Sequence, residues 1–117
     1  MNATQIEAMT RRIQEFRDAR DWKQFHNPKD IALSMMLEAG EVAEHFQWMN
    51  PQEMQAHSAA HHDKIGEELD DVLYWVLLLS ADLKIDLAEA FDKKMKLNEK
   101  KYPIEKSKGR HTKYDKL

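Results

Sequence analysis

The chain has 117 residues, of which 42% are hydrophobic and 33% charged, with a net charge of −3 and no cysteine. This length fits one domain. The negative charge argues against a general nucleic-acid binder, and the lack of cysteine excludes disulfides and Cys-ligated zinc. The N-terminal stretch has no signal-peptide hydrophobic region, and the longest aliphatic run, residues 76–79, is far too short for a bilayer. We therefore expect a cytoplasmic protein with no membrane partner.

All predicted elements are helices. Residues 4–20 carry apolar side chains at a spacing typical of an amphipathic helix, at Ile6, Met9, Ile13 and Phe16. After a polar break, a second helix is predicted over residues 29–48. The segment 49–62 is polar and contains Pro51, so we predict a connection with a short helical turn at most. A third helix is predicted over 63–83, and a fourth over 87–101 ends before Pro103.

The predicted fold is all-α, a four-helix bundle that forms a single domain over residues 1–117. Residues from about 103 to 117 are polar and basic, and we interpret them as a tail or an arm over a neighbouring chain. The third helix is apolar nearly all round between Val72 and Leu79, and such a helix is normally buried on most sides. Four helices would hardly cover it, so we predict a homo-oligomer.

Two pairs of acidic residues lie inside segments that otherwise have the pattern of core helices. Glu38 and Glu41 are three residues apart on the second predicted helix, and Glu68 and Asp71 repeat this spacing on the third. Residues three apart project from one helix face. Antiparallel neighbouring helices could therefore bring the two pairs together, and helix bundles use such facing carboxylates to hold metal ions.

Four carboxylates at close range favour a bound cation, because like charges raise one another's pKa. Oxygen ligands without cysteine favour Mg²⁺, with Mn²⁺ as a substitute, and Mg²⁺ among carboxylates is typical of phosphate chemistry. The alternative is a solvated helix face, which is the usual role of glutamates at helical spacing. Against that alternative, Glu38 and Glu41 stand among apolar residues with no nearby Lys or Arg on the same helix.

These residues resemble the signature of the MazG-type all-α nucleoside triphosphate pyrophosphohydrolases. The signature reads E-x-x-E at Glu38–Glu41 and E-x-x-D at Glu68–Asp71. Four blocks in the same order resemble the dCTP pyrophosphatase branch of that family: RDWKQFHNP, GEVAEHFQW, EELDDVLYW and the late N-x-x-x-YP from Asn98 to Pro103. The similarity covers about residues 8–117.

The resemblance implies hydrolysis of a nucleoside triphosphate between its α and β phosphates, giving a monophosphate and pyrophosphate. It implies dCTP or a modified dCTP as the substrate, sanitation of the nucleotide pool as the purpose, and a dimer or tetramer as the assembly. It also implies that Glu38, Glu41, Glu68 and Asp71 ligate Mg²⁺. Glu38 and Glu41 would be catalytic, with Glu41 orienting or deprotonating the attacking water.

Several aromatic and polar side chains are candidates for substrate binding. From the sequence alone, a Trp at a helix end is more often a lid on the core than a stacking platform, and polar residues four apart are more often a hydrated face. The resemblance instead assigns substrate contacts to Trp22, His26, Trp48, Trp75, Lys94, Asn98, Tyr102 and Arg110. Trp75 stands where related enzymes carry a tyrosine, which leaves the shape of the base pocket open.

Four histidines, His45, His57, His61 and His62, lack the spacing of a zinc site, and we interpret them as surface residues. Two other functions stay open. One is a dUTP or broad-specificity dNTP pyrophosphatase with the same chemistry, because one hydrogen-bonding group in the pocket decides between bases. The other is a non-catalytic nucleotide-binding or regulatory bundle that uses the carboxylates only structurally.

Overall fold

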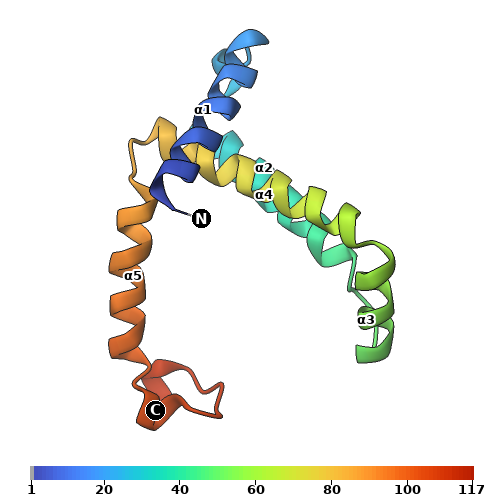
Figure 1. Ribbon diagram of the computed structural model, residues 1–117, viewed down its shortest axis with the longest axis vertical. Coiled ribbons are helices and arrows are strands. Elements are labelled where there is room, and N and C mark those ends of the chain that lie inside the picture. Colours follow the sequence, from blue (N-terminus) through green and yellow to red (C-terminus); the bar gives the residue numbers. More distant parts are fainter. Residues whose placement is uncertain (1) are drawn as a thin grey trace. The chain divides into compact units, whose positions relative to one another are not determined.

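The fold is all-α, as predicted. The computed structural model describes residues 2–117, and within them the chain forms six α-helices, two short 3₁₀ helices and no strand (Figure 1). The α-helices are α1 (Ala3–Ala19), α2 (Pro28–Glu44), α3 (Pro51–Ala60), α4 (His62–Asp82), α5 (Leu87–Lys101) and α6 (Ile104–Ser107). The 3₁₀ helices are η1 (Lys23–Phe25) and η2 (Tyr114–Lys116). Residues 2–117 thus contain two more α-helices than the predicted four.

Asparagine and aspartate side chains set the starts of the long helices. Asn2 accepts a hydrogen bond from the Gln5 amide at 2.9 Å at the start of α1, and Asn27 accepts one from Asp30 at 2.9 Å at the start of α2. Asp86 does the same for α5. These are N-caps, which satisfy amide groups that have no partner inside the helix.

Helix α3 forms where a connection was predicted, and its own sequence explains why. Asn50 accepts a hydrogen bond from the Glu53 amide at 2.8 Å, and the Glu53 side chain accepts one from the Asn50 amide at 3.3 Å. This reciprocal pair is a capping box, and Pro51 occupies the first turn, where its missing N–H is tolerated. The proline therefore begins a helix here instead of breaking one.

The chain divides into two compact units, one ending at Lys84 and the other spanning Ile85–Leu117. In the first unit α4 packs along α2 and, less extensively, against α1 and α3. The fully buried apolar side chains are few: Ile31 of α2, and Leu77 and Leu78 of α4. Figure 1 shows α2 and α4 running side by side, and this pair is the frame of the candidate site.

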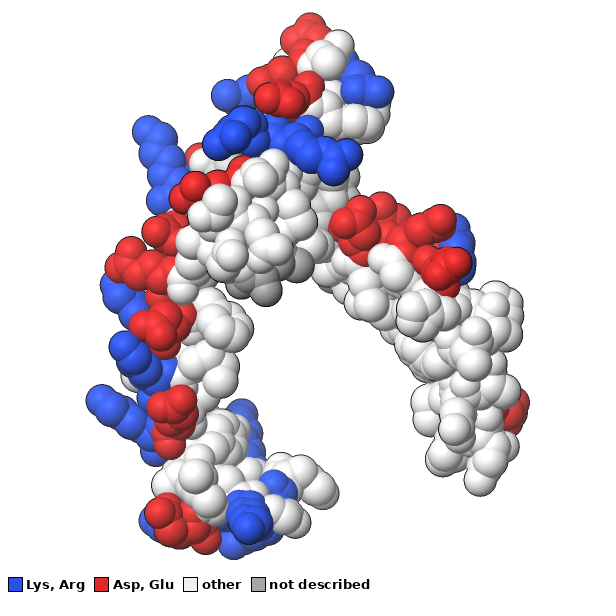
Figure 2. Space-filling model, in the orientation of Figure 1, with Lys and Arg blue, Asp and Glu red and all other residues white. Residues whose placement is uncertain are grey.

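The second unit contains α5, α6 and η2. Lys93 pairs with Glu89 at 2.7 Å and Lys96 with Asp92 at 3.0 Å along α5. Figure 2 shows charged side chains of both signs on one side of α5 and uncharged surface on the other. The predicted tail is more ordered than expected: the Tyr114 ring lies 6.1 Å from that of Tyr102, and the Lys101 ammonium lies 4.7 Å from the Tyr114 ring centroid.

Across residues 2–117, no helix combines the length and the apolar character that a membrane-spanning segment needs.

Candidate active site

The two carboxylate pairs lie on the two helices that pack most closely. Glu38 and Glu41 belong to α2, and Glu68 and Asp71 belong to α4. Glu38 and Glu68 are partly buried, whereas Glu41 and Asp71 are exposed. Figure 2 shows acidic side chains gathered over α4 on the first unit.

Electrostatics show that the pairs influence each other across the helix interface. The pKa of Glu38 is raised, first by burial and then by the negative charges of Glu41 and Asp71, with a smaller effect from Glu68. Burial and the charges of Asp70 and Glu41 likewise raise the pKa of Asp71. Burial and nearby like charges each disfavour the ionised form of a carboxyl group. The raised pKa values of Glu38 and Asp71 therefore indicate negative charge that nearby positive charges do not balance.

The donor chemistry fits a hard divalent cation, because all four side chains offer carboxylate oxygens. Within residues 2–117, however, no three His, Asp or Glu side chains converge closely enough to hold a metal ion in the described conformation. The assignment of Glu38, Glu41, Glu68 and Asp71 as ligands therefore stays a prediction.

Two of the predicted substrate-binding residues, His26 and Trp75, lie together. Their ring centroids are 5.4 Å apart in an edge-to-face arrangement, between the segment after η1 and the middle of α4. Nδ1 of His26 is buried and has no hydrogen-bond partner among the described residues. Burial, followed by the positive charge of Arg17, lowers the pKa of His26 and favours its neutral form.

Trp22 and Trp48 are placed differently. The Trp22 ring lies 5.6 Å from that of Phe16 in an edge-to-face contact, so it packs against α1. Trp48 follows the end of α2 with 92% of its surface exposed and a backbone φ of 70°, a region that bulky residues seldom adopt. The structure describes no ring contact between either tryptophan and the His26–Trp75 pair, and their roles stay predictions.

The remaining four candidates belong to the second unit. Lys94 and Asn98 lie on α5, and the Tyr102 amide donates to the Asn98 carbonyl at 2.8 Å where that helix ends. Lys94 and Asn98 are therefore one turn apart on α5, whereas Tyr102 is the C-cap residue just outside the helix. Arg110 follows α6 and is exposed, with its amide donating to the Ser107 carbonyl at 3.1 Å. Their contacts with a substrate stay predictions.

A family model describing the MazG-like family matches residues 33–117, a span that holds all four carboxylates. The chain belongs to the MazG-like family. The resemblance inferred from the sequence motifs is thereby confirmed.

Relatives and a solved structure agree with this MazG-like assignment. The chain is 39% identical over 114 residues to dCTP pyrophosphatase 1 of Bos taurus, covering 96% of this chain and 68% of that protein. It is 37% identical to dCTP pyrophosphatase 1 of Homo sapiens, covering 96% of this chain and 67% of the relative. The crystal structure of a pyrophosphatase from Archaeoglobus fulgidus DSM 4304 superposes with a TM-score of 0.81 at 36% identity, covering 85% of this chain and 93% of the other.

Sequence reasoning missed the surroundings of Glu68. His45 and His57 were interpreted as surface residues, but His45 contacts Glu68 and His57, and both histidines are partly buried. That interpretation is wrong for these two because it treated residues 49–62 as a connection; α3 carries His57 to His45. The interpretation holds for His61 and His62, which are both exposed. The capping box at Asn50 was the signal that could have revealed α3 in this MazG-like chain.

Proposed function

We propose that this chain hydrolyses dCTP, or a dCTP carrying a modified base, to the nucleoside monophosphate and pyrophosphate. Membership of the MazG-like family and similarity to named pyrophosphatases make it a nucleoside triphosphate pyrophosphohydrolase. The observation that carries the choice of dCTP is the 39% identity, over 96% of the chain, to a protein named dCTP pyrophosphatase 1. Such an activity would remove unwanted nucleotides from the pool that polymerases use.

The carboxylates of α2 and α4 support a requirement for Mg²⁺, with Mn²⁺ as a substitute. Raised pKa values at Glu38 and Asp71 indicate negative charge that a divalent cation would offset. Glu41 and Asp71 are exposed, so their side chains can change rotamer and turn toward a common cation. When bound, Mg²⁺ polarises phosphoryl oxygens and neutralises charge on a pyrophosphate leaving group.

We assign to Glu41 the role of deprotonating the attacking water. In this step the water oxygen forms a bond to the α-phosphorus, and the bond from that phosphorus to the bridging oxygen breaks. The bridging oxygen leaves with pyrophosphate, and Glu41 accepts the proton that the water loses. Glu38 precedes Glu41 by one turn on the same helix face and shares the task of holding the reacting groups in place.

The His26–Trp75 pair is the part of the first unit that best fits a base. Aromatic rings stack bases, and each such contact is worth about 1–3 kcal/mol in proteins that bind single-stranded nucleic acids. The buried, unpaired Nδ1 of His26 offers a hydrogen bond that could distinguish one base or sugar from another. We extend the base contacts to Trp22 and Trp48, and contacts to sugar and phosphates to Lys94, Asn98, Tyr102 and Arg110.

The experiment measures pyrophosphate release from a panel of canonical and modified nucleoside triphosphates, with Mg²⁺, with Mn²⁺ and with chelator. Glu41→Gln serves as the inactive variant, and Glu44→Gln, on the same helix but outside the proposed site, is the matched control. We expect turnover of dCTP-type substrates that needs the cation, is abolished in Glu41→Gln and is unchanged in Glu44→Gln.

The other outcomes separate the alternatives. Equal turnover of every base would keep the reaction and reject the specificity. A preference for dUTP would assign the chain to that activity. Cation-independent turnover would reject the role given to Mg²⁺, and no pyrophosphate from any triphosphate would favour a non-catalytic nucleotide-binding bundle.

We also propose that the chain works as a homo-oligomer, because the first unit leaves much apolar surface uncovered. On α2, Leu33, Met36 and Leu37 are exposed at the spacing of one helix face. An open pocket of about 340 Å³ lies between α1 and α4 and is lined mainly by apolar side chains. Exposed apolar patches of this kind mark interaction sites, and a second copy of the chain offers the same face.

A further inference from the structure

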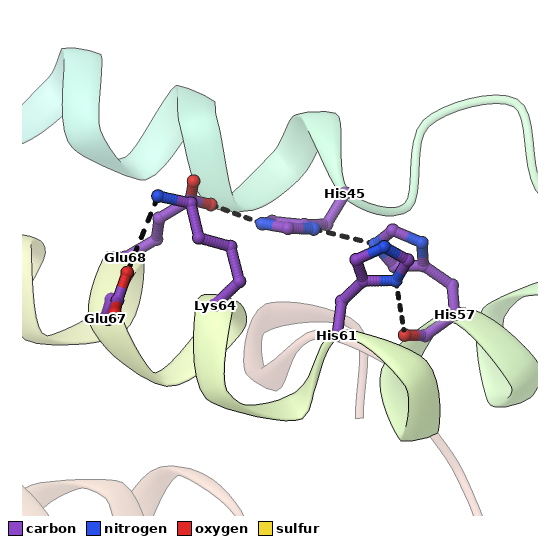
Figure 3. Close-up of polar contacts among 6 residues, drawn as sticks. All are labelled: His45, His57, His61, Lys64, Glu67 and Glu68. Carbon is purple, nitrogen blue, oxygen red and sulfur yellow. Dashed lines mark hydrogen bonds and ion pairs between the residues drawn. The ribbon is translucent and has the colours of Figure 1, made fainter.

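His45 contacts one of the predicted metal ligands directly. It lies immediately after the last residue of α2, and its Nε2 is 2.5 Å from Oε2 of Glu68 on α4 (Figure 3). The two side chains are 12% and 13% exposed. Oε2 of Glu68 is buried and accepts no hydrogen bond among the described residues, and it meets Nε2 of His45 as an ion-pair contact. A buried carboxylate oxygen without a partner is destabilising, so His45 is what stabilises it there.

A second histidine holds His45 in turn. Nδ1 of His45 lies 2.7 Å from Nε2 of His57 on α3, and the His57 ring stacks on that of His61 with centroids 4.3 Å apart (Figure 3). Burial and the charges of His61 and His45 lower the pKa of His57, which favours its neutral form.

The contacts hold the His45 ring from both sides. The Glu68 carboxylate has no proton to give, so Nε2 of His45 must face it with an N–H group. On the other side, a single hydrogen bond joins Nδ1 of His45 to Nε2 of His57, in a direction that depends on which nitrogen carries the proton. His57 thereby fixes the orientation in which His45 faces Glu68.

We propose that His45 is a positioning residue that fixes the Glu68 carboxylate for divalent-cation binding, and that His57 positions His45. This inference rests on the metal role of Glu68 in the proposed function. By engaging Oε2, His45 prevents rotation of the carboxylate and leaves Oε1 as the oxygen available to a cation. Ligands that an outer partner holds in place bind metal better, and loss of the outer partner typically weakens metal affinity or activity about 10–100-fold.

The test compares variants that keep or remove the N–H donor. His45→Leu removes the N–H donor and places an apolar side chain in the partly buried position. His45→Gln instead retains an amide N–H that can reach Glu68. His57→Phe keeps a ring that can stack on His61 but removes the hydrogen bond to His45. His62→Ala is the matched control, because His62 is exposed and its ion pair is with its neighbour Asp63.

The primary measurement is the affinity of the full-length, nucleotide-free protein for Mg²⁺ by calorimetry and for Mn²⁺ by electron paramagnetic resonance. The secondary measurement is the Mg²⁺ concentration that gives half-maximal pyrophosphate release. We expect about tenfold weaker binding in His45→Leu, about threefold or less in His45→Gln, an intermediate loss in His57→Phe and none in His62→Ala. Circular dichroism establishes that each variant is folded.

Wild-type affinity in folded His45→Leu would overturn the inference, as would equal losses in His45→Leu and His45→Gln. If His45→Leu does not fold, the inference stands or falls on whether His57→Phe weakens binding while His62→Ala does not. A wild-type protein that binds Mg²⁺ in a His45-dependent way but releases no pyrophosphate would support this inference and reject the proposed reaction. A wild-type protein that binds neither cation would overturn the inference itself.

Discussion

Arg17 and Asp82 join α1 to the end of α4 through two parallel hydrogen bonds. Nη1 and Nη2 of Arg17 donate to the two carboxylate oxygens of Asp82, each at 2.8 Å. The Arg17 side chain is 2% exposed and that of Asp82 is 22% exposed, so the guanidinium is buried and its counter-charge is partly buried. The Arg17 carbonyl also accepts a hydrogen bond from the Trp22 amide at 3.1 Å, which ties the segment before η1 to the same point. The pair therefore holds the segment that carries Trp22 and His26 against α4.

We predict that Asp82→Asn destabilises the protein by about 3–5 kcal/mol, because it leaves a buried guanidinium without its counter-charge. The double variant Arg17→Met/Asp82→Leu should lose less, since it removes both charges and fills the space with apolar atoms. Urea unfolding of wild type, Asp82→Asn, the double variant and its two single variants, Arg17→Met and Asp82→Leu, measures this. A double variant as unstable as the sum of its single changes would show that the pair has no coupling.

The same pair predicts a loss of stability in acid. The hydrogen bond from Arg17 lowers the pKa of Asp82 below its ordinary value of 3.8. In the unfolded chain Asp82 therefore binds protons more readily than in the folded protein. Its stabilising contribution is complete above the unfolded pKa, near pH 4, and is lost as pH falls through the folded pKa.

Other carboxylates titrate in the same range, so the informative quantity is the difference between two proteins. The unfolding free energy of wild type minus that of Asp82→Asn should shrink as pH is lowered from 6 toward 2.5. A difference that stays constant over this range would contradict the assignment of the acid-sensitive contribution to Asp82.

The sequence predicted the long helices because their signals are local. Apolar periodicity located α1, α2, α4 and α5 to within a few residues, and E-x-x-E with E-x-x-D marked both helices of the candidate site. The contacts that the sequence did not predict are those between residues far apart in the chain. His45 and His57 meet only because α3 forms and lies beside α4, and the Arg17–Asp82 pair joins residues 65 apart in the chain. Neither contact has a local sequence pattern, so the periodicity of apolar residues cannot predict it.

Glu38→Gln should stabilise the metal-free protein. The side chain is partly buried, and burial together with the charges of Glu41 and Asp71 disfavours its ionised form. Replacing it with a neutral isostere removes that repulsion. We expect a higher melting temperature than wild type in chelator. On addition of Mg²⁺ the order should reverse, because only wild type gains stability from a ligand that binds the native state. A lower melting temperature in chelator would show that the repulsion is already relieved.

Trp48 gives a prediction in which stability and activity move in opposite directions. Its φ of 70° is readily adopted by glycine, and its side chain is 92% exposed. Trp48→Gly should therefore leave stability unchanged or raise it by up to about 1 kcal/mol, whereas Trp48→Ala keeps the backbone strain. If Trp48 contacts the base, both variants raise KM for the nucleotide. A large loss of stability in Trp48→Gly would show instead that the ring covers apolar surface, for example in a second copy of the chain.

The exposed apolar face of α2 predicts self-association that a single charge can disrupt. Leu37 is 68% exposed and lies beside Leu33 and Met36 on that face. The Leu37→Glu variant should keep α2 helical, because glutamate is a good helix former. The added charge should oppose burial of this face against a second copy of the chain. Sedimentation at several concentrations should find wild type larger than one chain and Leu37→Glu shifted toward the monomer. Gln52→Glu, which adds the same charge on exposed α3, is the matched control and should sediment as wild type. A wild-type protein that is monomeric at all concentrations, with a melting temperature independent of concentration, would contradict the proposed assembly.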